Sequence, residues 1–254
     1  MSQWGFYFNQ NRCIGCKACV MGCKNWNKRF RGDNAFHIDS VEAVNANSDY
    51  TPKVDSMQSS IPFMDETGAL NTDELGKYCM KENWRTVTEH DKGSITVDSD
   101  TNTYVSTFDR SYLSAACNHC SDPACVKACP MGVYHKDLET GIVLYNNASC
   151  ISCGRCNSAC PWENPQYYSK DYATYPQNDP ERPRMTKCTG CFDRISEGLK
   201  PACVAACRAR ALDFGPMSEL ESKYNGDFNH YADGFEPGVT QPNIIFRAKK
   251  NIIA

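Results

Sequence analysis

The sequence has few of the features that mark membrane, secreted or nucleic-acid-binding proteins. No stretch approaches the roughly 18 apolar residues of a transmembrane helix, so we expect no membrane span. Charge is nearly balanced, with 27 Lys and Arg against 30 Asp and Glu, and no basic block suggests a nucleic-acid surface. The opening MSQWGFYFNQ contains neither a twin arginine nor a basic region followed by an apolar one. We therefore expect the protein to be made in the cytoplasm.

Cysteine, by contrast, is abundant, with 17 residues among 254. All except Cys79 fall into four tetrads. The first and third tetrads have the spacing C-x2-C-x2-C-x3-C, the second has C-x2-C-x4-C-x3-C, and the fourth has C-x2-C-x11-C-x3-C. In chain order the tetrads are Cys13, Cys16, Cys19 and Cys23; Cys117, Cys120, Cys125 and Cys129; Cys150, Cys153, Cys156 and Cys160; and Cys188, Cys191, Cys203 and Cys207.

The compact spacing is that of bacterial ferredoxins, in which three cysteines ligate one cubane iron–sulfur cluster and the fourth ligates another. Zinc sites use pairs of cysteines and have no use for a third at this spacing. An odd cysteine count and ligand-type spacing oppose a disulfide framework. The tetrads therefore predict four [4Fe–4S] clusters. We interpret the lone Cys79 as a small buried apolar side chain.

Two pairings of the tetrads are open. Only 20 residues, about one hairpin, separate tetrads two and three, which favours a unit built from these two and a second unit built from tetrads one and four. The rival pairing joins one with two and three with four. The favoured pairing predicts four ligand sets, each called after its first cysteine: Cys13, Cys16, Cys19 and Cys207; Cys23, Cys188, Cys191 and Cys203; Cys117, Cys120, Cys125 and Cys160; and Cys129, Cys150, Cys153 and Cys156.

The expected fold class is α+β with little regular structure. It comprises two ferredoxin-like units, one nested inside the other. Residues 1–30 and 180–215 form the first unit, and residues 104–179 form the second. Residues 31–103 are a loop-rich insertion, and residues 216–254 are a C-terminal extension. Because such units have small hydrocarbon cores, metal ligation is expected to supply much of the folding energy.

A few local elements can be predicted. WGFYFNQNRC reads as a strand with an aromatic face, and NTYVSTF as another strand. Glu139, Thr140 and Gly141 supply the turn of a hairpin whose second strand starts at Ile142. NTDELGKYCMKENW is expected to contain a helical turn. Ser218 is expected to cap a short helix, with Glu221 completing a capping box.

Several charged residues near the cysteines are candidates for tuning cluster potentials. Lys17 and Arg155 occupy equivalent positions in tetrads one and three, where positive charge would raise a potential unless water screens it. His135 lies six residues past Cys129 and is a third candidate, although a solvated loop histidine is the simpler interpretation. His119, inside the second cluster loop, is expected to pack or to donate a hydrogen bond to a sulfide. Trp162 either covers a cluster or simply packs.

The segments CIGCKACVMGCK, ACNHCSDPACVKACP, CISCGRCNSACPWENPQY, MTKCTGCFDRISEGLKPACVAACRARALDFG and PNIIF together resemble the iron–sulfur subunit of the dimethyl sulfoxide reductase family of molybdopterin oxidoreductases. The likeness covers residues 3–30 and 104–247. It implies an electron-transfer subunit with four clusters, which relays single electrons between a molybdenum–bis(pterin) catalytic subunit and a quinol-side or other redox partner. It supports the nested pairing and places the Cys13 cluster nearest the molybdenum, followed by the Cys23, Cys117 and Cys129 clusters.

The resemblance also implies that this chain holds no molybdopterin and no catalytic site of its own. A membrane anchor subunit is a possible further partner. If the catalytic partner carries a twin-arginine signal, the protein would work on the outer face of the cytoplasmic membrane; otherwise it would work in the cytoplasm. Two alternatives stay open, namely an electron-transfer subunit of a formate dehydrogenase or hydrogenase, and a free-standing polyferredoxin. The likeness names no substrate.

Overall fold

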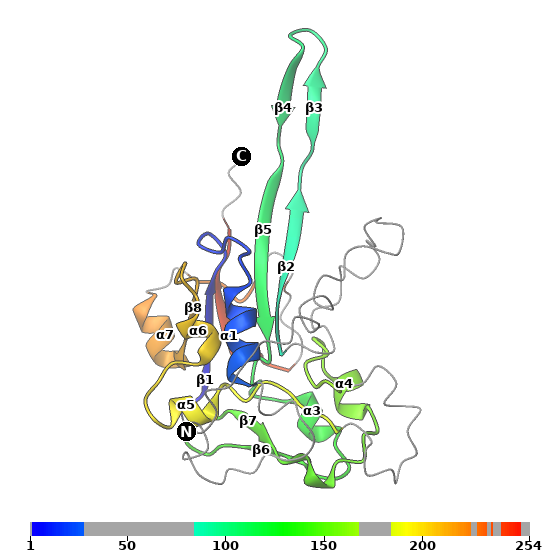
Figure 1. Ribbon diagram of the computed structural model, residues 1–254, viewed down its shortest axis with the longest axis vertical. Coiled ribbons are helices and arrows are strands. Elements are labelled where there is room, and N and C mark those ends of the chain that lie inside the picture. Colours follow the sequence, from blue (N-terminus) through cyan, green and yellow to red (C-terminus); the bar gives the residue numbers. More distant parts are fainter. Residues whose placement is uncertain are drawn as a thin grey trace, which may run out of the picture.

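Short strands and helices of one or two turns make up the described part of the chain (Figure 1). The computed structural model describes residues 2–27, 84–167, 184–224, 228–232, 235 and 240–249. Cys79 and the helical turn expected around it lie outside these residues. The elements are β1 Trp4–Asn9, α1 Ala18–Trp26, β2 Arg85–Lys92, β3 Ile95–Asp98, β4 Thr103–Ser106, β5 Asp109–Ala116, α3 Ala124–Lys127, β6 Tyr134–Lys136, β7 Val143–Tyr145, the 3-10 turn Asn147–Ser149, α4 Arg155–Ala159, α5 Phe192–Ile195, α6 Ala202–Ala205, β8 Leu212–Pro216, α7 Met217–Lys223 and β9 Ile244–Arg247.

The N-terminal strand β1 is the centre of a three-stranded sheet. It pairs antiparallel with β8 and parallel with β9, so that Phe6 lies opposite both Phe214 and Ile244. The predicted aromatic face is confirmed, because Phe6 and Phe8 are fully buried and the ring of Phe6 packs 4.6 Å from that of Phe214. Strand β9 comes from the expected C-terminal extension. That segment therefore completes the first unit rather than following it.

Helices α1 and α6 pack closely and bring the two ends of the cysteine pattern together. A Cβ atom added to Gly22 in α1 would lie 2.6 Å from Ala206 Cβ and 3.0 Å from the carbonyl oxygen of Ala202. Only glycine allows this approach. Because α1 carries Cys19 and Cys23 and α6 carries Cys203, the contact places the first tetrad beside the fourth.

The predicted hairpin after the second tetrad is confirmed. Strands β6 and β7 pair antiparallel, with Tyr134 opposite Tyr145, and Val143 at the start of β7 is buried. The second strand begins at Val143, one residue later than expected. Helices α3 and α4 pack against each other beside this hairpin and carry cysteines of tetrads two and three. Cysteines of tetrads two and three thus lie on adjoining helices, which is compatible with a unit built from these two tetrads.

A long two-stranded arm projects from the body of the molecule (Figure 1). Strands β2 and β5 pair along its base, and β3 and β4 pair along its outer part. The strand expected in NTYVSTF is present as β4. Residues 84–103, assigned to a loop-rich insertion, belong to this arm, which continues across the expected boundary at residue 103. The rest of the expected insertion, residues 31–83, lies outside the described residues.

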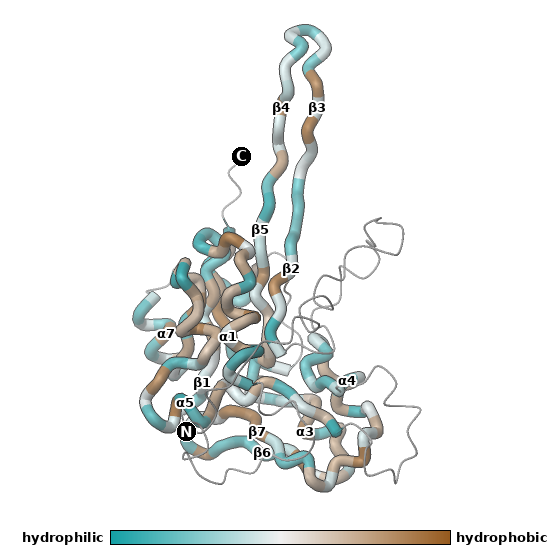
Figure 2. Tube along the Cα trace, in the orientation of Figure 1, coloured by the Kyte–Doolittle hydropathy of each residue, from teal (hydrophilic) through white to brown (hydrophobic). Residues whose placement is uncertain are grey.

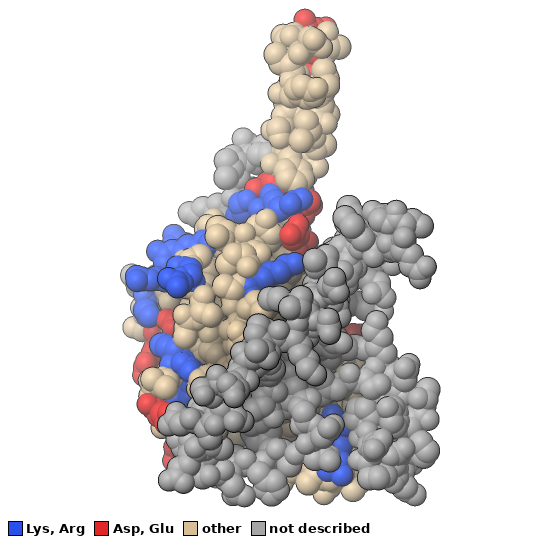
Figure 3. All heavy atoms as spheres, viewed as in Figure 1, with Lys and Arg blue, Asp and Glu red and all other residues tan. Residues whose placement is uncertain are grey.

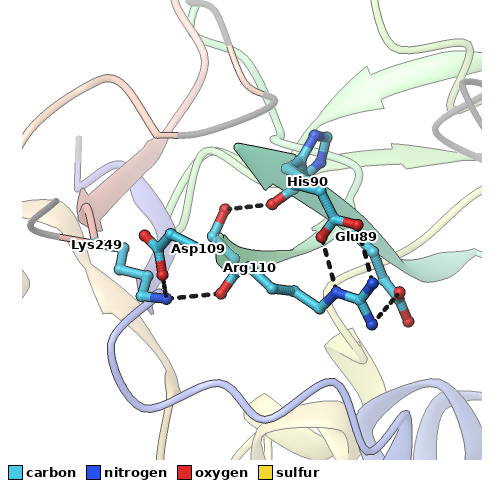
Figure 4. Close-up of polar contacts among 7 residues, drawn as sticks. Glu89, His90, Asp109, Arg110 and Lys249 are labelled. Atoms are coloured by element: carbon cyan, nitrogen blue, oxygen red, sulfur yellow. Dashed lines mark hydrogen bonds and ion pairs between the residues drawn. The ribbon is translucent and has the colours of Figure 1, made fainter. Parts of the chain in front are cut away.

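Ion pairs tie the arm to the body at its base (Figure 4). Arg110 in β5 donates from Nε and Nη2 to the two carboxylate oxygens of Asp91 in β2, at 2.7 and 2.9 Å, and its Nη1 lies 3.3 Å from Glu89. Lys249 pairs with Asp109 and donates to the carbonyl oxygen of Arg110 at 2.7 Å. These contacts join both strands of the arm to the residues that follow β9.

The short helix α7 differs from its prediction at the N-terminus. It begins at Met217, directly after Pro216, and no side chain caps it, so the expected cap by Ser218 is wrong. The fixed φ of proline suits the start of a helix and makes a serine cap unnecessary there. Leu220 is buried beside Tyr7 and Ile245. Among the described helices, none is long and apolar enough to cross a membrane.

Candidate metal centres

Three cavities are each lined by four tetrad cysteines. The first contains the predicted Cys117 set, the second contains the Cys23 set, and the third contains the Cys129 set. We call these places the Cys117, Cys23 and Cys129 sites. No disulfide joins any of their cysteines.

The remaining four cysteines form a fourth group, the Cys13 site. The pKa of the Cys13 thiol is raised to about 11, mainly by burial, and the nearby charges of Cys19, Cys207 and Cys16 contribute, although a hydrogen bond from the Gly15 backbone opposes them. The interaction joins three cysteines of the first tetrad to the last cysteine of the fourth. The structure thus brings together the four members of each set in the nested pairing, and it places Cys23 beside Cys188, Cys203 and Cys191 rather than beside the second tetrad.

Backbone turns in the cysteine loops direct N–H groups toward the sulfurs. Gly190 has a φ of +67° and donates its N–H to Cys188 Sγ at 3.3 Å. Ser152 has a φ of +52° and donates to Cys150 Sγ at 3.4 Å. Successive left-handed and right-handed residues form concave nests of N–H groups that bind anions. These loops are therefore shaped to hold negatively charged sulfur.

Other donors reach the sulfurs from outside the loops. Ala211 N–H lies 3.3 Å from Cys207 Sγ, and Asn164 N–H lies 3.4 Å from Cys160 Sγ. Hydroxyl and amide side chains make further contacts at 3.3–3.7 Å: Ser114 with Cys19, Thr240 with Cys120, Tyr167 with Cys156, and Asn27 with Cys23. Hydrogen bonds to ligand sulfur stabilise the thiolate and help to set a cluster's reduction potential.

Burial makes the bare cysteines hard to ionise. It raises the pKa of the Cys120, Cys125 and Cys191 thiols to about 12 and that of Cys188 to about 11. A metal ligand must lose its proton, so only a strong positive centre in the cavity would hold these groups as thiolates. We expect folding and metal binding to be tightly coupled for this reason.

The shape of the sites suits a cluster better than a single ion. Among the described residues, no three His, Cys, Asp or Glu side chains converge on the position of one metal ion. Their sulfurs instead surround a cavity, and a [4Fe–4S] cube takes one thiolate at each of four separate irons. Among the described residues, two buried polar atoms also have no hydrogen-bond partner, namely Arg85 Nη2 and His119 Nε2. Arg85 and His119 line two of the cavities, and Tyr134 lies against Cys156, so a bound group with acceptor sulfides fits the space.

The four sites follow one another in a row. Arg85 interacts with Cys203 and Cys19, which joins the Cys23 and Cys13 sites. Burial is the main cause that raises the pKa of Cys188, and the charge of Cys117 is the second cause. The Cys23 and Cys117 sites are therefore neighbours. Tyr134 interacts with Cys156 and Cys125, which joins the Cys129 and Cys117 sites. All four cysteines of the Cys23 site are buried, whereas the two terminal sites each have one exposed cysteine, Cys16 and Cys153.

The residues proposed from sequence to tune the potentials lie on the surface. Lys17, Arg155 and His135 are all exposed. His119 is fully buried and accepts a hydrogen bond at Nδ1 from Val143 N–H at 3.2 Å. Burial lowers its pKa well below the usual value, so the ring is neutral with its proton on Nε2. Trp162 is buried on the wall of the Cys117 cavity and stacks on the Phe235 ring at 5.4 Å, which combines the covering and packing roles.

Sequence reasoning missed two buried cations, Arg85 and Lys187. They are 2% and 0% exposed. Lys187 directly precedes Cys188, and its Nζ lies 3.6 Å from Cys117 Sγ. The position of Lys187 directly before the predicted ligand Cys188 could have identified it from the sequence. Arg85 stands at the start of an alternating strand, where arginine is normally solvated, and its sequence neighbours carry no comparable signal.

Comparison with known proteins agrees with this geometry. A 4Fe-4S dicluster domain matches residues 108–217, and a 4Fe-4S binding domain matches residues 4–25. The B subunit of anaerobic dimethyl sulfoxide reductase from Haemophilus influenzae is 33% identical over 98% of this chain and 91% of the relative, and the same subunit from Escherichia coli K12 has the same identity and coverage. Chlorate reductase subunit beta of Ideonella dechloratans is 29% identical over 93% of this chain and 76% of the relative.

Proposed function

The chain belongs to the family of electron-transfer iron–sulfur subunits that includes the B subunit of anaerobic dimethyl sulfoxide reductase, and we propose that it carries four [4Fe–4S] clusters. The clusters are ligated by the Cys13, Cys23, Cys117 and Cys129 sets. They connect a molybdenum–bis(pterin) catalytic subunit with a second redox partner, which is a quinol-side subunit or another electron donor or acceptor. The row of four cysteine sites with an exposed cysteine at each end is the observation that carries this proposal.

The protein's own residues have three tasks in this function. The thiolates hold each cluster in place, and the N–H and hydroxyl donors around the sulfurs stabilise negative charge. Burial of the Cys23 site keeps water away from the middle of the row. When bound, each cluster takes up and releases one electron at a time. Because these thiolates would fill every iron, the four cysteine sets would leave no open coordination position on the clusters.

Both ends of the row have apolar surface beside the exposed cysteine. Ile14, between Cys13 and Cys16, is 69% exposed, and Met131 and Ile151 on the wall of the Cys129 site are also exposed. Exposed apolar side chains around a redox centre suit the approach of a protein partner. In line with the resemblance, we place the catalytic subunit at the Cys13 end and the second partner at the Cys129 end.

The substrate of the complex would be set by the catalytic partner. The relatives belong to reductases of dimethyl sulfoxide and chlorate. Anaerobic affinity purification of the tagged chain from its native host, followed by metal analysis, tests the proposal. We expect a large subunit that contains molybdenum or tungsten. A nickel–iron partner would favour the hydrogenase alternative, and a chain that purifies alone would favour a polyferredoxin.

A further inference from the structure

Two positive charges lie deep inside the protein, and no carboxylate of the described residues forms an ion pair with either of them. Arg85 and Lys187 are almost completely buried, and within the described part of the chain neither forms an ion pair. An unpaired buried charge is costly, so it normally has a negative partner. The negative groups near both cations are the cysteine sulfurs and whatever those sulfurs bind.

Arg85 lies between the Cys13 and Cys23 sites. It lines the Cys23 cavity, and its Nη1 donates to Ser114 Oγ at 3.0 Å, while the same Ser114 oxygen lies 3.4 Å from Cys19 Sγ. The guanidinium carbon lies 4.6 Å above the ring of Phe6, which fixes its plane. Its second terminal nitrogen, Nη2, is buried and has no partner. One cation therefore borders two neighbouring sites and has a donor left over.

Lys187 lies between the Cys23 and Cys117 sites. Its Nζ donates to the carbonyl oxygens of Val143 and Cys188, the latter at 2.8 Å, and lies 3.6 Å from Cys117 Sγ. These contacts hold the ammonium group on the wall of the Cys117 cavity, one residue from a cysteine of the Cys23 site. The next gap, between the Cys117 and Cys129 sites, holds the neutral phenol of Tyr134 instead of a cation.

We propose that Arg85 and Lys187 are fixed charges that set the reduction potentials along the row. The inference rests on the proposed four-cluster function. Reduction adds negative charge to a cluster, so a buried cation nearby favours the reduced form and raises the potential. Arg85 acts on the Cys13 and Cys23 clusters, and Lys187 acts on the Cys23 and Cys117 clusters. Both charges therefore raise the reduction potential of the Cys23 cluster, and neither raises that of the Cys129 cluster.

Redox titration of the anaerobic protein, followed by electron paramagnetic resonance, tests this assignment. In Arg85→Gln, two of the four midpoint potentials should fall by at least about 59 mV. A shift of this size is a tenfold change in the equilibrium constant of a one-electron reduction. In Lys187→Met, two should fall as well. The two variants should share one shifted signal, because the Cys23 cluster borders both residues.

Two further variants separate charge from packing. Arg85→Lys keeps the charge and should keep all four midpoints near their original values. Arg155→Gln removes an exposed cation next to the Cys129 site and should cause no shift of this size, because water screens that charge. Unchanged midpoints in both neutral variants, or an equal shift of all four, would overturn the proposal.

The iron content distinguishes this proposal from the proposed function. If wild-type protein lacks four clusters, the function is wrong; if it has four and the shared-signal pattern is absent, only the role of the cations is wrong. If Arg85→Gln or Lys187→Met loses iron, its potentials cannot be compared, and the iron content of Arg85→Lys tests the proposal instead. Full loading of Arg85→Lys supports a need for charge at this place, and loss of iron in that variant contradicts it.

A separate observation concerns the arm, whose outer part carries exposed apolar side chains. Ile95 and Val97 in β3 and Tyr104 in β4 share one face, because Val97 lies directly opposite Tyr104, and Tyr104 is 80% exposed. Figure 2 shows the apolar residues of β3, and the face in view in Figure 3 has acidic atoms at the tip but no Lys or Arg along the outer arm. A lone two-stranded ribbon is at best marginally stable in water.

The base of the arm touches the loop of the Cys13 site. The ring of Tyr112 in β5 lies so close to Gly15 that a Cβ there would be 2.4 Å from it, and Gln10 Nε2 donates to the carbonyl oxygen of Tyr112 at 3.3 Å. Exposed Cys16 and Ile14 belong to the same loop. We infer that the apolar face of the arm binds the catalytic subunit at the Cys13 end. This inference rests on the proposed orientation of the row.

Co-purification with a triple variant tests the arm. Ile95→Ser, Val97→Ser and Tyr104→Ser together should lower recovery of the catalytic subunit at least tenfold while the iron content stays unchanged. Val105→Thr, on the opposite face, is the matched control and should leave recovery unchanged. Undiminished recovery of the catalytic subunit by the triple variant would overturn the inference, as would loss of a different partner alone. The iron content again reports separately on the four-cluster function.

Discussion

Replacement of Asp213 by asparagine should loosen the segment that carries the last two cysteines. Asp213, in β8, accepts hydrogen bonds from Lys200 at 2.9 Å, Lys223 at 2.6 Å and Tyr224 at 2.9 Å, so it joins the segment before α6 and the helix α7 to the sheet. Burial by itself would raise the pKa of this carboxyl, but the donors outweigh burial and lower it to about 2.

The size of the effect follows from that pKa. A fall from 3.8 to about 2 corresponds to roughly 2–3 kcal/mol. Both lysines are more than half exposed, so water screens part of this interaction, and we expect a loss of about 1–2 kcal/mol in the free energy of unfolding. Because the folded pKa is lower than the unfolded one, the stabilisation is fully present above about pH 4 and disappears as the pH falls through about 2.

The assay is loss of cluster absorbance in urea at pH 7 under anaerobic conditions, compared between Asp213→Asn and wild type. A loss of 1–2 kcal/mol corresponds to about a 5- to 30-fold change in the ratio of folded to unfolded protein. Asp91→Asn removes an exposed carboxylate that pairs with Arg110 and is the matched control, with little expected change. If the two variants behave alike, the reasoning about Asp213 is wrong.

Three further predictions concern the cysteine sites. Cys23→Ser and Cys191→Ser should alter the same paramagnetic signal, whereas Cys16→Ser should alter a different one; a match between Cys23→Ser and Cys16→Ser would refute the nested pairing. Gly22→Ala should push α1 away from α6 and lower iron loading of the Cys13 and Cys23 sites by iron analysis, and full loading would contradict the close-packing argument. Cys153→Ser should block electron exchange with the partner at the Cys129 end while dyes still reduce the other clusters, and unimpaired exchange would reverse the orientation.

The local chemistry of the cysteines could be predicted because their spacing reflects the geometry of a cluster loop. The same holds for β1 and for the β6–β7 hairpin, whose alternation and turn residues act over short distances. Each of these features depends on neighbours in the sequence. The iron–sulfur family assignment, which the relatives confirm, rests on such local motifs as well.

The arm and the buried Arg85 could not be predicted because they depend on distant contacts. We predict a loop-rich insertion at residues 31–103, and local sequence gives no sign of the cross-strand pairs of residues 85–116, which span up to 31 positions from Arg85 to Ala116. Arg85 is buried only because β2 lies against the Cys19 region and the fourth tetrad. Lys17 and Arg155, which lie beside cysteines in sequence, are exposed, whereas Lys187, directly before Cys188, is fully buried.

The iron and acid-labile sulfide content of the anaerobically purified chain bears on the whole account. Four complete sites predict about sixteen iron and sixteen sulfide per chain, with no zinc. The count should not depend on whether the partner is present, because every ligand belongs to this chain. About eight of each, or zinc in stoichiometric amount, would contradict the interpretation of the four cysteine sites as a row of four cubane clusters.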